Sequence, residues 1–183
     1  MTKIESLNNL KRWEYNVPLY LTLPIGTKPS LIELRKLGDA IGIRTYKDSQ
    51  QIATPFFKNL APKDARPLIC DLHTQGYHCI AAKLIPPEWT IISVELELHP
   101  DLSGRATIVR GPSWCKDVEV SANTESVNWS YLSQIQSDDL REIISYCKDI
   151  PLLAGNRSII IEASLLRYLA GYKRETIVLW EYR

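Results

Sequence analysis

The sequence WTIISVELELH (residues 89–99) is followed by PDLSG (100–104) and RATIVR (105–110), and this stretch decides the fold class. Apolar residues occupy every second position from Ile92 to Leu98, which is typical of a strand with one buried face and one wet face. The intervening Pro- and Gly-containing segment is typical of a turn. The two flanking segments are therefore predicted to form an antiparallel hairpin.

The residues before this hairpin alternate between helix and strand patterns. Ser30 and Glu33 have the spacing of a capping box, in which each side chain satisfies a free amide at a helix start. Gly42 and Gly76 are suited to end helices, because glycine accepts the left-handed conformation. We predict a strand at Val17–Leu23, a helix over 31–41, a strand at Ile43–Lys47, a loop over 48–61, a helix over 63–75 and a strand at Tyr77–Ile85.

The residues after the hairpin add at least one helix and one strand. Ser137 is followed by two carboxylates, a pattern that favours the start of a helix. We expect this helix to end at Pro151. Ile159–Tyr172 begins with β-branched residues, which favour a strand, and ends with Leu-rich sequence, which favours a helix. The segment is therefore predicted to be either a helix or a strand followed by a helix. Val118–Ala122 and Thr176–Tyr182 are predicted strands. The order of the predicted helices and strands indicates an α+β protein with one mixed or largely antiparallel sheet and about four helices.

Length, composition and charge exclude several classes of protein. The 183 residues are 45% hydrophobic and 23% charged, which excludes a disordered or fibrous chain. No repeat or linker divides the sequence, so residues 1–183 are expected to form a single domain. The 22 basic and 21 acidic residues argue against coating nucleic acid through charge alone. No secretory signal is recognisable at the N-terminus, which predicts a cytoplasmic protein with free thiols and no membrane partner.

The glycines exclude the familiar phosphate-binding loops. The eight glycines include no Gly-x-Gly fingerprint and no Gly-x₄-Gly-Lys spacing. A Gly-x-Ser-x-Gly elbow is also absent from the sequence. Classical nucleotide-binding proteins and serine hydrolases are therefore disfavoured, and we expect no cofactor.

Thiol and imidazole side chains gather in one segment. Cys70, His73, His78 and Cys79 are ligand types that zinc prefers. Because neighbouring side chains of a strand point to opposite faces, at most three of the four can converge, and Cys70, His73 and Cys79 remain candidate zinc ligands. Ordinary core thiols and histidines explain the same residues without a metal. A cysteine nucleophile activated by imidazole is a further possibility.

Two carboxylates lie on the wet face of the central strand. Glu95 and Glu97 are separated by two positions, so they share that face and could bind Mg²⁺ through oxygen ligands. A metal-dependent hydrolase or nuclease that uses this pair, or a small zinc-bearing module, is the alternative function. Simple solvated strand residues explain the pair without a metal, and this is the favoured interpretation.

Basic and aromatic residues form the pattern on which the first functional hypothesis depends. Arginine can hold phosphate with two hydrogen bonds, and an aromatic ring can stack on an unpaired base. The predicted nucleic-acid-binding residues are Arg105, Arg110, Trp114, Lys116, Tyr172, Lys173 and Arg174. A rim of solvated basic side chains around core aromatics is the other explanation.

These observations lead to a non-catalytic prediction. We expect a binding subunit of a cytoplasmic assembly, such as a ribonucleoprotein or a nucleic-acid-processing complex. Its predicted partners are other protein subunits and RNA or single-stranded DNA.

Overall fold

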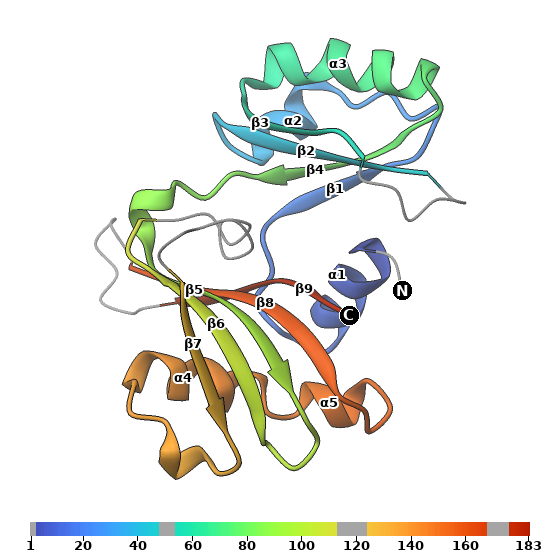
Figure 1. Cartoon of the computed structure of the whole chain (residues 1–183). Coiled ribbons are helices and arrows are strands. Elements are labelled where there is room, and N and C mark those ends of the chain that lie inside the picture. The colour runs from blue at the N-terminus through green and yellow to red at the C-terminus, as the bar shows by residue number, and fades with distance from the viewer. Residues whose placement is uncertain (1–2, 48–53, 113–123, 168–175) are drawn as a thin grey trace. The chain divides into compact units, whose positions relative to one another are not determined.

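The structure is a computed structural model, which describes residues 3–47, 54–112, 124–167 and 176–183. By internal contacts the chain divides into two compact units, shown in Figure 1. The larger unit contains residues 1–17 and 86–183, and the smaller unit contains residues 18–85.

The smaller unit is a four-stranded antiparallel sheet with two helices. The strand order is β1-β4-β2-β3, so the central pair joins strands that are far apart in sequence. The elements are β1 (Tyr20–Leu23), α2 (Leu31–Lys36), β2 (Ile41–Tyr46), β3 (Phe56–Leu60), α3 (Pro62–Thr74) and β4 (His78–Lys83).

The core of the smaller unit lies between its sheet and its helices (Figure 1). Ile41 and Ile43 of β2 are buried with Leu34 of α2 and Ile69 of α3. The alternation of side chains along β2 sends Gly42, Arg44 and the other intervening residues to the opposite side. We call that side the helix-free face of the smaller sheet.

The larger unit is a five-stranded antiparallel sheet in the order β7-β6-β5-β8-β9. Helices α4 and α5 lie against one face of it, and α1 lies beside β9 (Figure 1). The elements are α1 (Lys3–Arg12), η1 (Pro87–Trp89), β5 (Thr90–Leu98), β6 (Gly104–Arg110), β7 (Glu125–Trp129), η3 (Leu132–Gln134), α4 (Asp138–Cys147), α5 (Ile150–Leu153), β8 (Ile159–Leu166) and β9 (Thr176–Tyr182).

The apolar side chains of the central strands form the core of the larger unit. Leu96 of β5 and Ile161 of β8 are buried with Ile143 and Ile144 of α4. Glu95, Glu97 and the residues that alternate with the core positions lie on the other side of the sheet. We call that side the helix-free face of the larger sheet.

The N-terminal segment attaches to the last strand. The Ser6 hydroxyl accepts a hydrogen bond from the Tyr182 amide at 2.7 Å, and the Leu179 amide donates to the Asn16 carbonyl at 2.9 Å. Leu10 of α1 is fully buried in the core of the larger unit. The two ends of the sequence therefore stabilise each other within one unit.

The predicted α+β class and the hairpin of β5 and β6 are confirmed. The strands form two sheets, and no expectation covered α1 or β7. The loop predicted over 48–61 is wrong for Phe56–Leu60, which form β3. The helix that begins at Leu31 ends near Leu37, because Gly38 takes a φ of 117° and Ile41 already belongs to β2. The ambiguous segment from Ile159 is strand through Leu166. The predicted strand at 118–122 lies outside the described residues.

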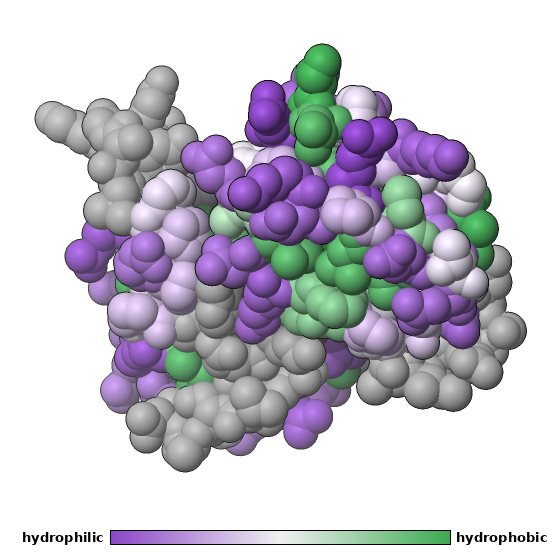
Figure 2. Space-filling view, turned by 90° about the horizontal axis from the view of Figure 1, so that it is seen from above, coloured by the Kyte–Doolittle hydropathy of each residue, from purple (hydrophilic) through white to green (hydrophobic). Residues whose placement is uncertain are grey.

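Within the described ranges, every helix falls short of the length and hydrophobicity that a membrane crossing requires. Figure 2 shows a mixed surface from above, with hydrophilic side chains around a smaller hydrophobic group. The large hydrophobic side chains that are exposed in the described ranges are Leu19, Ile25, Ile32, Tyr131, Leu152 and Leu153.

Candidate functional site

Three glutamates are neighbours across the larger sheet. The pairing of β5 with β8 places Glu95 opposite Glu162, and the pairing of β8 with β9 places Glu162 opposite Glu181. Glu97, two positions from Glu95 on the same face, pairs with Arg105 instead. The three carboxylates therefore form a compact acidic group on the helix-free face of the larger sheet.

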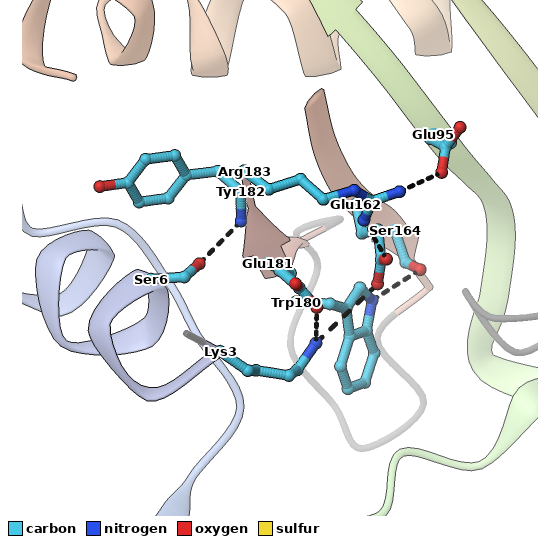
Figure 3. A network of polar contacts seen from close by, with 9 residues as sticks. All are labelled: Lys3, Ser6, Glu95, Glu162, Ser164, Trp180, Glu181, Tyr182 and Arg183. Atoms are coloured by element: carbon cyan, nitrogen blue, oxygen red, sulfur yellow. Dashed lines mark hydrogen bonds and ion pairs between the residues drawn. The ribbon is translucent and has the colours of Figure 1, made fainter. Parts of the chain in front are cut away.

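Two basic side chains of the same unit neutralise most of this charge (Figure 3). Arg183 donates from Nη1 to Glu162 at 2.9 Å and from Nη2 to Glu95 at 2.8 Å. Lys3 Nζ lies 2.7 Å from a Glu181 oxygen and 3.9 Å from a Glu162 oxygen. Burial lowers the pKa of Arg183, but the hydrogen bond and charge of Glu162 outweigh it and raise the pKa overall. We call these five residues the charged network.

Polar side chains extend the charged network along β8 and β9. The hydroxyls of Ser93 and Ser164 are 3.0 Å apart and buried. The Trp180 indole donates to Ser164 at 2.9 Å (Figure 3). Among the described residues, no buried side-chain nitrogen or oxygen is left without a hydrogen bond. The network is thus an internally satisfied polar arrangement.

Arg105 and Arg110, predicted to bind phosphate, pair with carboxylates of the chain itself. Arg105 Nε lies 2.5 Å from the Glu97 carboxylate on the neighbouring strand. Arg110 donates to Glu125 at 3.1 Å and lies 3.7 Å from Asp139. The partners of Arg110 come from β7 and α4, so this arginine ties three elements together. Trp114, Lys116, Tyr172, Lys173 and Arg174 lie outside the described residues.

The candidate zinc ligands make hydrogen bonds or pack in the core instead of converging on one point. In the described ranges, no three His, Cys, Asp or Glu residues are placed to hold a metal ion. His73 Nε2 lies 3.1 Å from the Leu23 carbonyl, and His78 Nδ1 accepts a hydrogen bond from the Ile25 amide at 3.2 Å. The two histidines therefore hold the turn that follows β1. Cys79 faces the core between sheet and helices.

The buried thiols are poor nucleophiles. Burial raises the pKa of Cys79 to about 11, and it raises the pKa of Cys147 further. A nucleophilic cysteine requires a thiolate near neutral pH. The raised pKa of Cys79 therefore disfavours it among the cysteines considered as nucleophiles, which were Cys70, Cys79 and Cys115. Cys115 lies outside the described residues.

The helix-free face of the smaller sheet carries cations and aromatic rings. The Arg44 guanidinium lies 5.1 Å from the centre of the Phe56 ring, and the Lys58 ammonium lies 5.6 Å from it. Tyr46 and His78 stack with their ring centres 4.9 Å apart. The described strand positions of this face contain no Asp or Glu. Within the described part of the chain Arg44 makes no ion pair.

Sequence reasoning named Glu95 but missed the other four members of the charged network and the cations and rings of the smaller sheet. Lys3, Glu162, Glu181 and Arg183 meet only because β8 pairs with both β5 and β9 and because α1 lies beside β9. One signal was present, since Glu162 is the only charged residue in a strand of mostly apolar residues. Arg44 likewise interrupts a buried strand.

No protein-family model and no curated protein matches the sequence. Solved structures do match in fold. The D-alanine–D-alanine ligase from Bacillus anthracis complexed with ATP has a TM-score of 0.62 at 9% identity, over 99% of this chain and 52% of that chain. An ADP complex of an N5-carboxyaminoimidazole ribonucleotide synthetase has a TM-score of 0.57 at 12% identity, over 97% and 42% of the two chains.

A third match names the fold. An ATP-grasp ligase complexed with a minimal precursor has a TM-score of 0.52 at 16% identity, over 100% of this chain and 51% of that chain. The chain spans about half the length of the structures that it matches.

This comparison corrects the functional prediction. The proteins that share the fold are ligases and a synthetase, some of them in complex with ATP or ADP, rather than nucleic-acid-binding subunits. The prediction of a non-catalytic, RNA-binding accessory subunit is therefore wrong. The ion pairs of Arg105 and Arg110 agree with this correction. The fold of this chain is like that of about half of an ATP-grasp ligase.

Proposed function

We propose that this chain binds an adenine nucleotide. The observation that carries the proposal is the likeness of nearly the whole chain to ATP-grasp ligases, two of which were solved with ATP or ADP. Fold alone does not specify function, so residues suited to the ligand are also required. Nucleotide binding, rather than ligation, is proposed because the chain spans about half the length of these ligases.

The helix-free face of the smaller sheet supplies suitable residues. Arginine donates paired hydrogen bonds to phosphate, and Arg44 has no carboxylate partner in the described part of the chain. Lys58 adds a second positive charge over the same ring. We assign the phosphates of the nucleotide to these two cations.

The aromatic side chains of the same face suit the base. A purine ring stacks on aromatic side chains irrespective of its hydrogen-bonding edge. Tyr46 and His78 are already stacked, with an angle of 23° between their planes. This pair would provide a flat, half-buried platform beside the cations.

Titration with a fluorescent ATP analogue, followed by competition with unlabelled ATP, tests the proposal. We expect saturable binding, and Arg44→Gln should weaken it about tenfold or more because a charge-assisted hydrogen bond is lost. Arg66→Gln is the matched control, since Arg66 is an exposed arginine of α3, and it should leave the affinity unchanged. Circular dichroism would verify that both variants fold.

Two results would contradict the proposal. One is the absence of saturable binding by the wild-type protein at millimolar nucleotide. The other is an equal loss of affinity in Arg44→Gln and Arg66→Gln, which would indicate general charge attraction. Adenosine and inorganic tripolyphosphate as competitors would separate recognition of the base from recognition of the phosphates.

A further inference from the structure

His99 and Ser158 meet where β5 ends and β8 begins. The pairing of these strands places Leu98 opposite Ile159, so the next position brings His99 beside Ser158. His99 Nδ1 lies 2.6 Å from the Ser158 hydroxyl oxygen, which is hydrogen-bond distance. Ser158 is exposed and His99 is half-buried, so a reagent in solution can reach the hydroxyl. The pair belongs to the larger unit alone and contains no member of the charged network.

The turn between β5 and β6 fixes the backbone of His99. The His99 amide donates to the Ser103 carbonyl at 3.0 Å, and the Leu102 amide donates to the His99 carbonyl at 2.9 Å. Leu102 has a φ of 65°, and its carbonyl accepts a hydrogen bond from the buried Trp129 indole at 2.7 Å. This left-handed conformation is unfavourable for leucine, and such residues persist where the surroundings enforce them, often beside functional side chains. The turn therefore presents the imidazole from a fixed position.

A second tight turn precedes Ser158. Gly155 and Asn156, between α5 and β8, have φ values of 95° and 55°. The Arg157 amide donates to the Pro151 carbonyl at 3.2 Å, and the residue after Ser158 is the buried Ile159. The backbone is therefore held on both sides of the serine.

Asp101 adds a negative charge beside the pair. Its carboxylate accepts hydrogen bonds from the Ser103 hydroxyl at 2.6 Å and from the Ser103 amide at 3.0 Å, and these bonds lower its pKa. The charge of His99 lowers the pKa of Asp101 further, so these two side chains interact electrostatically. By the same interaction, an ionised Asp101 stabilises the protonated form of His99.

A serine hydroxyl that contacts an imidazole is the arrangement that makes serine a nucleophile. The hydroxyl reacts poorly until a neighbouring base accepts its proton, and the two groups lie about 2.6–3.2 Å apart in such pairs. With its own hydrogen on Nε2, the neutral His99 ring accepts the Ser158 proton at Nδ1. Asp101 then favours the positive charge that the ring acquires.

We propose that Ser158 is a nucleophile toward activated carboxylic esters, with His99 as its general base. The Ser158 oxygen forms a bond to the ester carbonyl carbon, and its proton moves to His99 Nδ1. The bond between that carbon and the leaving oxygen breaks, and the leaving group takes the proton from Nδ1. The products are an acylated Ser158 and an alcohol or phenol. Water then attacks the acyl group by the same proton route, which releases a carboxylic acid and restores the serine.

Reaction with p-nitrophenyl acetate tests the proposal. We expect a burst of p-nitrophenol of about one equivalent per chain, with the acetyl group located on Ser158 by peptide mass spectrometry. Ser158→Ala should abolish both signals, whereas Ser158→Cys should keep acetylation at this position. Ser130→Ala is the matched control, because Ser130 is an exposed serine of the same unit, and it should change nothing.

Two further variants separate activation by the imidazole from a purely structural hydrogen bond. His99→Gln should slow the burst about a hundredfold, because the general base is lost. Asp101→Asn should slow it by a smaller factor, about threefold to tenfold, because only a neighbouring charge is removed. Circular dichroism would verify that the variants fold, and His99→Asn provides a second replacement of the same base.

Three results would overturn the proposal. They are the absence of acetyl on Ser158 in the wild-type protein, an equal burst rate in wild type and in the histidine variants, and acetylation spread evenly over exposed serines and lysines. None of them bears on nucleotide binding, which the titration with the fluorescent ATP analogue tests separately.

Discussion

The Arg183 guanidinium lies 2.8 Å from the Glu95 carboxylate, although 88 positions separate the two residues in the chain. The contact crosses from the end of β9 to β5, over the intervening strand β8, whose Glu162 binds the same guanidinium. Ile160 of β8 and Arg183 also exchange both backbone hydrogen bonds at 2.8 Å. One residue therefore helps to fix the register of three strands.

A double-mutant cycle on Arg183 and Glu95 should measure this connection. Both side chains are about a third exposed, so we expect Arg183→Gln to lower the free energy of unfolding by only about 1 kcal/mol. Glu95→Gln combined with Arg183→Gln should cost less than the sum of the single changes, because the pair is lost only once. Urea denaturation gives the energies. Strict additivity would show that the pair contributes nothing.

The glycine at the start of β6 should be irreplaceable. A Cβ atom at Gly104 would lie 2.2 Å from the Glu97 carbonyl oxygen and 3.0 Å from the Trp129 ring. Gly104→Ala should therefore lower the free energy of unfolding by about 2 kcal/mol or more, because backbone must move.

Gly42→Ala is the matched control in the other sheet, where the nearest atoms to a new Cβ lie at 3.6 Å. This change should cost less than about 1 kcal/mol. Urea denaturation of both variants gives the comparison, and equal costs would mean that the strand pairing around Gly104 differs from the one described.

The buried Cys79 thiol should make stability fall at alkaline pH. Its pKa is raised from 9.0 to about 11 in the folded protein, so the unfolded chain releases the proton first as the pH rises. The contribution of Cys79 to the free energy of unfolding is complete below pH 9 and is lost as the pH approaches 11. In this range the free energy of unfolding falls by up to about 1.4 kcal/mol per pH unit. Comparing wild type with Cys79→Ala in this window isolates the effect. Parallel pH profiles would refute it.

Zinc should not stabilise the protein through Cys70, His73 and Cys79. His73 contacts the Leu23 carbonyl and Cys79 faces the core, so the three side chains do not converge. Added Zn²⁺ should leave the melting temperature of wild type and of His73→Ala unchanged relative to EDTA-treated protein. His73→Ala itself should cost about 1 kcal/mol through the lost hydrogen bond. A zinc-dependent rise in melting temperature that is seen only in wild type would show that these residues do bind zinc.

Local patterns predicted the elements whose signals are local. Ser30 and Glu33 form the expected capping box at the start of α2, and Ser137 accepts a hydrogen bond from the Leu140 amide at the start of α4. The strand Thr176–Tyr182 agrees with its predicted bounds. Strand β3 was missed, because Phe56–Leu60 alternates poorly and Asn59 takes a positive φ of 57°.

The nucleotide-binding motifs that the sequence lacks belong to other folds, so their absence said little about this one. Glycine-rich fingerprints are recognisable because they are short and continuous. The likeness to ATP-grasp ligases, at 9 to 16% identity, lies in the fold and carries no comparable local signature. It could be found only by comparing structures.

The sequence by itself determined the α+β class, the β5–β6 hairpin and the helix starts, because each depends on residues within a few positions of one another. The tertiary structure decided that Lys3, Glu162, Glu181 and Arg183 form one network and that Arg44 and Lys58 share one aromatic ring. These groupings depend on which strands pair and in which register. Strand pairing is set by the burial of whole apolar faces contributed by distant segments, and no local pattern specifies it.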